Sequence, residues 1–134
     1  MIASKDFNFS FSGLKTAVLY ALRDMPKNTR IASVVSVMAK EFQDAVVDVL
    51  AEKTIRAAKQ YGVKAIAIGG GVSANRLLRE RLAHEVNTQL PRTDLFLPDP
   101  SLTGDNALMI AIAAAIDGKK KAPDEIRAEA NMRL

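Results

Sequence analysis

Residues 65–76 read AIAIGGGVSANR, and this stretch decides the fold. A short apolar run breaks into three consecutive glycines, and a helix-starting Ser-Ala-Asn follows them. The order predicts a strand, then a glycine turn, then a helix. Such a turn leaves backbone N–H groups bare at the positive end of the helix, where an anion can bind or a nucleotide can lie flat on the main chain.

The glycine turn has two interpretations. Gly69, Gly70 and Gly71 could contact a nucleotide through main-chain N–H groups, with help from the side-chain amide of Asn75. The stretch matches neither the dinucleotide-binding nor the P-loop fingerprint, because no Lys-Ser/Thr pair follows the glycines. Alternatively, a strand-to-helix turn needs glycine only for its backbone angles. The pattern by itself leaves both interpretations open.

The sequence before this stretch is mostly helical. Apolar residues at helical spacing predict one amphipathic helix that begins at Ser12-Gly13 and stops before Pro26. A second helix is predicted over residues 29–60 and would be roughly 48 Å long. That length is large for a small domain, so we expect the helix to lie across a sheet or between two lobes. Residues 1–12 look extended, since phenylalanines alternate there with polar residues.

The sequence from residue 63 onward alternates between strands and helices. Residues 63–68 predict the first strand, residues 73–87 a helix, and residues 95–97 a second short strand. Pro98 and Pro100 then predict a loop without helix. The helix after that loop is apolar almost all round, so we expect it to be buried.

This order of elements predicts an α/β fold with parallel neighbouring strands. Two strands are few for a complete α/β domain, so the chain reads as part of a larger sheet. We expect residues 1–117 to form one lobe and residues 118–134 to form a polar C-terminal tail.

Composition excludes several classes of site. The chain has no cysteine, which rules out disulfides, thiolate chemistry and cysteine metal sites, and its one histidine is His84. The longest apolar run, residues 107–116, is too short to span a bilayer, and the N-terminus has no apolar signal core. We therefore expect a cytoplasmic protein without membrane contact. The net charge of +4 permits a nucleic-acid partner without requiring one.

Charged residues near the predicted sheet edge have two interpretations each. Asp105 follows the proline loop at the end of the sheet where ligands collect, so its carboxylate could hold a metal ion. Asp is also a preferred helix N-cap, and spacing alone favours that interpretation. Arg76, Arg79 and Arg81 follow the glycine turn and could contact RNA phosphates, although solvated helix charges explain them as well.

Four blocks of this sequence, taken together and in order, resemble one enzyme family. The blocks are FSFSGLKT at 9–16, FQDAVVDVL at 42–50, GGGVSANRLLR at 69–79 and DNALMIA at 105–111. They are similar to blocks of the tRNA N6-adenosine threonylcarbamoyltransferases, and the resemblance covers about residues 6–117. Four ordered blocks are far more specific than any one of them.

The resemblance implies a two-lobed fold of the actin and sugar-kinase type, of which this chain would be a partial, helix-rich lobe with a small, mostly parallel sheet. It implies transfer of a threonylcarbamoyl group from threonylcarbamoyl-adenylate to N6 of the adenosine next to the tRNA anticodon. On this mapping Gly70, Gly71 and Asn75 contact the adenylate. Asp105 would be a ligand of one divalent metal ion, iron or zinc.

The sequence also departs from that family. The family's other metal ligands are two histidines of a His-x-x-x-His helix in the other lobe, and the present chain has only His84. Gly104 stands where the family usually has Thr. No catalytic residue is assigned. We expect the C-terminal half of such an enzyme, inactive alone, which needs an N-terminal lobe or companion subunits to act on tRNA.

The alternative is a non-catalytic module. Such a module would bind a nucleotide weakly or assemble as a homodimer, because helices that lack their usual lobe partner would expose apolar surface.

Overall fold

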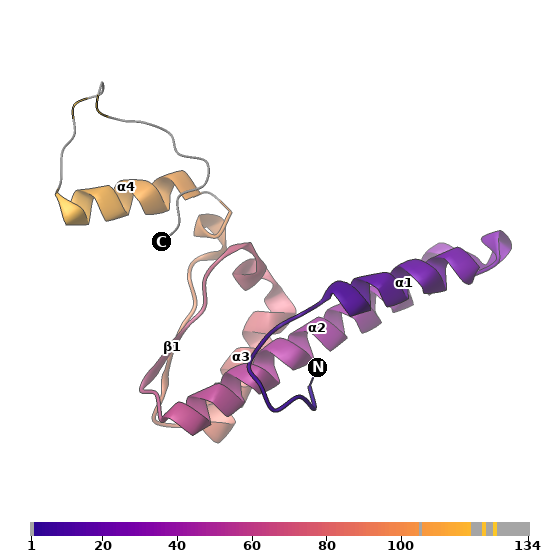
Figure 1. Cartoon of the computed structure of the whole chain (residues 1–134), viewed down its shortest axis with the longest axis horizontal. Coiled ribbons are helices and arrows are strands. Elements are labelled where there is room, and N and C mark those ends of the chain that lie inside the picture. The colour runs from indigo at the N-terminus through magenta and orange to yellow at the C-terminus, as the bar shows by residue number, and fades with distance from the viewer. Residues whose placement is uncertain (1, 105, 119–121, 123–124, 126–134) are drawn as a thin grey trace.

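The computed structural model describes residues 2–104, 106–118, 122 and 125. Within them, two helices lie along one face of a small two-stranded sheet (Figure 1). The helices and strands are α1 (Ser12–Asp24), α2 (Ala32–Tyr61), β1 (Ala65–Ala67), α3 (Arg76–Gln89), β2 (Asp94–Phe96) and α4 (Asn106–Asp117). Three 3-10 turns join them: η1 (Lys27–Thr29), η2 (Gly71–Ala74) and η3 (Pro100–Leu102).

The two strands pair in parallel, as the sequence predicts. Ala65 lies opposite Asp94, and Ala67 lies opposite Phe96. Hydrogen bonds at both ends of the ladder carry the pairing one residue further, to Lys64 and Ile68 of the first strand. Helix α3 is the crossover between the strands, so residues 65–96 form a β-α-β unit.

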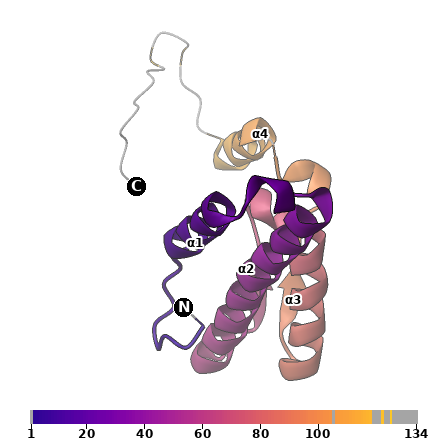
Figure 2. The same ribbon diagram turned by 90° about the vertical axis from the view of Figure 1, so that its right-hand side faces the viewer.

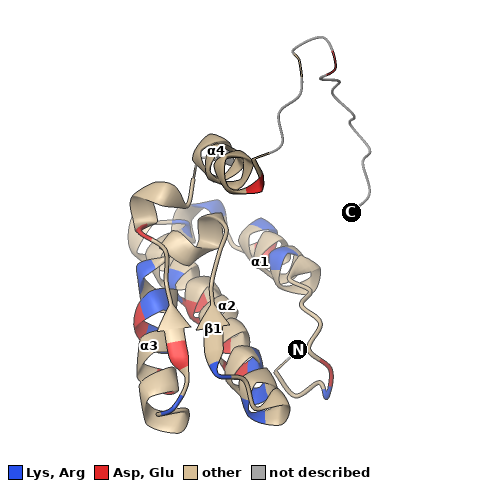
Figure 3. Ribbon diagram, turned by 90° about the vertical axis from the view of Figure 1, so that its left-hand side faces the viewer, with Lys and Arg blue, Asp and Glu red and all other residues tan. Residues whose placement is uncertain are grey.

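The core lies between α2, α3 and the sheet. Helices α2 and α3 run side by side (Figure 2), and both strands lie against this helix pair (Figure 3). Two clusters of buried side chains fill the contact: Val47, Ala51, Leu78 and Leu82 in one, Ile55, Ala58, Ile66 and Val86 in the other. The α/β class with a small parallel sheet is therefore confirmed.

Helix α2 begins three residues later than predicted, because η1 precedes it, and ends at Tyr61 with Gly62 as its C-cap. The left-handed backbone of Gly62, with φ of 59°, closes the helix by a bond from its N–H to Ala58 O. All the buried residues of α2 lie in its second half. Helix α1 packs along the first half, and the two form a hairpin that projects from the sheet (Figure 1).

The prediction that α4 is buried is wrong. The helix follows η3 and projects away from α2 and α3 (Figure 1), and Ile110 and Ile116 are 60% and 82% exposed. No other element in the described part of the chain covers its apolar side chains, which are exposed from residue 107 to residue 117. An apolar sequence shows that a helix needs cover without showing that the same chain provides it.

The proline loop also differs from its prediction, because it contains the turn η3. Pro100 is the first residue of that turn, a position where a missing N–H costs nothing. The carboxylate of Asp99 caps the turn by accepting a bond from Ser101 N at 2.8 Å.

The N-terminal segment forms no strand within residues 2–11, and a buried lysine binds it to α2 instead. The Nζ atom of Lys53, whose side chain is 1% exposed, donates to Ser4 Oγ at 2.9 Å, to Asp6 Oδ1 at 3.1 Å and to Asn8 O at 2.6 Å. Arg56 adds a bond to Asp6 O. Phe7 adds a long-range ring contact with Tyr61, at 5.8 Å between centroids. Polar and aromatic contacts with α2 therefore hold the segment that the alternating phenylalanines predicted to be extended.

The described residues include no helix with both the length and the apolar character needed to cross a membrane.

Candidate functional site

The glycine turn follows β1 directly and has an unusual backbone only at its centre. Gly70 has φ of 79° and ψ of 170°, a conformation that favours glycine. Gly69 and Gly71 have no positive φ, and a Cβ atom built on either would have no other protein atom within 4 Å. The backbone therefore explains glycine at position 70, whereas neither angle nor crowding within the described protein requires it at 69 or 71.

Ser73 fixes the far side of the turn. Its side chain is 1% exposed, and its hydroxyl donates to Gly70 O at 2.6 Å, while its backbone N–H donates to the same oxygen at 3.0 Å. These two bonds hold the turn in one conformation, with the glycines on the outside.

Asn75 is the N-cap of α3. Its Oδ1 accepts a bond from Leu78 N at 3.0 Å, which satisfies one of the free N–H groups of the first helical turn. The cap occupies the oxygen and leaves the Nδ2 group as the donor that can meet a ligand. Asn75 also lines one end of a groove of about 630 Å³ that continues between α1 and α2. The groove is otherwise mainly apolar.

Arg79 connects the glycine turn to the loop after β2. Its Nη1 atom donates to Ser73 O at 3.0 Å and to Pro98 O at 2.8 Å. The interpretation of solvated helix charges holds for Arg76, which is 91% exposed and pairs with Glu80. It does not hold for Arg79, whose hydrogen bonds are partly buried. Contact between these arginines and RNA phosphates stays a prediction.

The loop after β2 is stabilised by its own side chains. Asp99 Oδ1 accepts bonds from Ser101 Oγ and Ser101 N, and these bonds hold the pKa of that carboxyl below its usual value. Thr103 is buried, with its hydroxyl on Pro100 O at 2.8 Å. Asp105, the next predicted site residue, lies outside the described residues. Its two predicted roles, helix cap and metal ligand, stay predictions.

No metal centre is present among the residues that the structure describes, since no three His, Cys, Asp or Glu side chains there are close enough to share an ion. One carboxylate cannot hold a catalytic metal by itself. The described residues therefore do not fit a metal on their own, and we derive no metal-dependent step from them.

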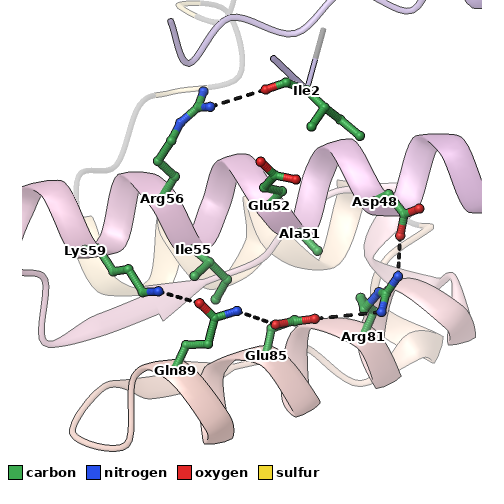
Figure 4. A pocket seen from close by; sticks show the side chains of 10 residues that line it. All are labelled: Ile2, Asp48, Ala51, Glu52, Ile55, Arg56, Lys59, Arg81, Glu85 and Gln89. Atoms are coloured by element: carbon green, nitrogen blue, oxygen red, sulfur yellow. Dashed lines mark hydrogen bonds and ion pairs between the residues drawn. The ribbon is translucent and has the colours of Figure 1, made fainter. Parts of the chain in front are cut away.

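A second cavity, of about 580 Å³, lies between α2 and α3 (Figure 4). A chain of polar contacts crosses it: Arg81 pairs with Asp48 and Glu85, Gln89 donates to Glu85, and Lys59 donates to Gln89. Its lining carries three acidic and three basic side chains, counting Glu52 and Arg56. The charges balance, so this cavity is a polar seam between the helices and offers no excess positive charge to a phosphate.

Sequence reasoning missed Ser73 and Arg79 as residues that fix the turn. A helical side chain points back toward the N-terminus of its helix, so residue 79, one turn after the cap at 75, covers the segment that enters α3. That rule could have assigned Arg79 to the turn. The contact with Pro98, 19 residues away, has no local signal.

Comparisons with known proteins identify the family of the chain. The sequence model of the family described as tRNA N6-adenosine threonylcarbamoyltransferase matches residues 1–112. A protein of that name from Listeria innocua is 49% identical over 116 residues, which are 87% of this chain and 33% of the relative. Relatives of the same name from Thermotoga neapolitana and Enterococcus faecalis are 46% and 42% identical, and 35% and 34% of their lengths are covered.

The chain thus spans about a third of the length of the relatives that it matches. The match covers most of the chain, including β1, the glycine turn, α3 and the loop after β2. This chain belongs to the tRNA N6-adenosine threonylcarbamoyltransferase family.

Proposed function

We propose that this chain supplies one wall of an adenylate-binding site in a tRNA-modifying threonylcarbamoyltransferase. The wall consists of residues 69–75, the glycine turn with η2 and Asn75, and is called the adenylate wall below. The complete enzyme would transfer a threonylcarbamoyl group from its adenylate to N6 of the adenosine next to the tRNA anticodon, in the cytoplasm.

The exposed glycine turn, with the cap residue Asn75 at its end, is the observation that carries this proposal. A Cβ atom built at Gly69 or Gly71 would have no other protein atom within 4 Å, so a flat group can lie against the backbone there. The positive end of the α3 dipole lies next to Asn75 and favours a negatively charged group there. The free Nδ2 of Asn75 adds a side-chain donor at the same end.

The remaining parts of the reaction would come from outside this chain. Asp105 would contribute one ligand to an iron or zinc ion only beside a lobe that carries two histidines, and a bound metal there would polarise the carbonyl group of the substrate. An N-terminal lobe or companion subunits would complete the tRNA site. We expect the chain alone to be inactive.

The first test of the adenylate wall is a titration of the chain with AMP, the nucleotide half of the substrate, followed by NMR. Amide signals of Gly69, Gly70, Gly71 and Asn75 should shift together and saturate, while signals of the distant Gln89 end of α3 stay in place. A titration with inorganic phosphate at the same concentrations separates nucleotide recognition from anion binding. Equal shifts across the whole chain, or none at all, contradict the proposal.

The exposed apolar helices favour a second candidate, an assembly module that forms a homodimer. Helix α4 exposes Leu108, Met109, Ile110, Ile112 and Ile116, and α1 exposes Leu19. Light scattering and the AMP titration together distinguish the two functions. A stable dimer that does not bind AMP supports the assembly module.

A further inference from the structure

We propose that Arg79 is a positioning residue, which locks the adenylate wall to the loop after β2 so that the two act as one rigid edge. This inference rests on the proposed function, in which the adenylate wall meets the nucleotide. Nothing in the glycine pattern assigns a role to Arg79.

The contacts of Arg79 form a continuous connection between the two segments. Gly70 O accepts from Ser73 Oγ at 2.6 Å, Ser73 O accepts from Arg79 Nη1 at 3.0 Å, and Pro98 O accepts from the same nitrogen at 2.8 Å. The guanidinium thus joins two backbone oxygens that lie 25 residues apart in the chain. The segments η2 and η3 also contact each other directly.

The chemistry of the connection is specific to arginine. A guanidinium is always charged, is planar, and has several N–H donors in fixed directions, so it can serve two carbonyl groups at once. Hydrogen bonds from a charged donor are stronger than those between neutral groups. The carboxylate of Asp99, next to Pro98, adds a favourable charge, since Arg79 contributes to the lowered pKa of Asp99.

Loss of this connection should loosen the wall without unfolding the helix behind it. Helix α3 keeps its cap, because Asn75 bonds to Leu78 N independently of Arg79. It also keeps Leu82 and Val86 in the two core clusters. The effect is therefore expected at η2 and η3 and not in the second half of α3.

The test compares Arg79→Met, Arg79→Lys and the matched control Arg76→Met in the full chain. Arg76 lies on the same helix and is exposed, with Glu80 as its partner. Amide hydrogen exchange is measured first, without ligand. In Arg79→Met the amides of Ser73 and Thr103 should exchange about tenfold faster, as expected from the loss of two hydrogen bonds, while those of Leu82 and Val86 keep their rates.

Affinity for AMP is the second measurement. Arg79→Met should weaken AMP binding about tenfold at an unchanged number of sites, Arg79→Lys should recover part of that loss, and Arg76→Met should match the unmodified chain. Unchanged exchange at Ser73 and Thr103 in Arg79→Met overturns the inference. So does faster exchange throughout α3, which would make Arg79 a general stabiliser. If the unmodified chain does not bind AMP, the proposed function fails, and the exchange measurement still decides the role of Arg79.

Discussion

Apolar side chains are buried in one region of the molecule and exposed in another. The buried region is the second half of α2 with the β-α-β unit, and the exposed region is α1, the first half of α2 and α4. All buried apolar side chains among the described residues lie between Val47 and Val86. Helix α1, residues 32–46 of α2 and α4 have none. We call residues 47–96 the central unit and these three segments the outer helices. The central unit carries its own core, whereas α4 has no cover from the described chain, and α1 and residues 32–46 of α2 cover each other only in part.

The outer helices contain large apolar residues of the kind found in protein cores, but many of these side chains are exposed. Val37 and Ile110 are 62% and 60% exposed, although residues of this type are usually inside a protein. Large exposed apolar patches mark surfaces that meet another protein. The chain spans about a third of the length of the relatives that it matches, and the contrast supports the proposal that it supplies one part of a larger protein.

Two truncations of apolar side chains test the difference in packing between the central unit and the outer helices, and they have the largest expected effect. Leu82→Ala removes a side chain that is 1% exposed, and it should lower the free energy of unfolding by about 3–4 kcal/mol because a cavity is left. Ile110→Ala in α4 should change it by less than about 0.5 kcal/mol. Urea unfolding followed by circular dichroism measures both. Equal losses would mean that α4 is packed as firmly as the central unit.

Lys53 offers a test at the border between the central unit and the N-terminal segment. Lys53→Met removes three hydrogen bonds to residues 4–8 and should destabilise the chain by about 1–3 kcal/mol. Proteolysis should then cut the segment before α1 more readily. Lys40→Met is the control, because Lys40 is 72% exposed and pairs with Asp44 one turn away. A loss from Lys40→Met as large as that from Lys53→Met would contradict the account.

Asn75 allows its two roles to be separated. Asn75→Ala should lower stability by about 1 kcal/mol through loss of the helix cap, whereas Asn75→Asp keeps a good cap. Asn75→Asp also replaces the Nδ2 donor by a negative oxygen, so it should reduce AMP binding at unchanged stability. Equal AMP affinity in Asn75→Asp and the unmodified chain would leave the cap as the only role of this residue.

The smallest expected effect concerns acid pH. The hydrogen bond from Lys53 holds the pKa of Asp6 below its ordinary value of 3.8. A carboxyl with a lowered pKa in the folded chain adds stability above its unfolded pKa, and that contribution is lost as the pH falls through the folded value. Stability should therefore drop slightly more below about pH 4 in the unmodified chain than in Asp6→Asn. Identical pH profiles would contradict this contribution.

Local patterns predicted much of the central unit. The apolar run and the three glycines are neighbours in sequence, so the strand and the turn follow from adjacent residues. The helix was predicted from residue 73, but the 3-10 turn η2 comes first, and α3 begins at Arg76 with Asn75 as its cap. The partners of Lys53 are 45 to 49 residues away, and one partner of Arg79 is 19 residues away, so no periodicity reports them. The prediction that α4 is buried failed for a related reason. Its apolar sequence indicates that the helix needs a packing partner, but it does not show which segment provides that partner.

The most direct test of the central claim, that this chain is one part of a threonylcarbamoyltransferase, is a complementation assay for tRNA modification. The chain is mixed with the part of the Listeria innocua relative that lies outside the matched segment, with tRNA, threonylcarbamoyl-adenylate and iron or zinc. The account predicts modified adenosine in the mixture and none with either part alone, and it predicts less with Asn75→Asp. Modification by the chain alone, or none in a mixture whose parts are both folded and associated, would contradict it.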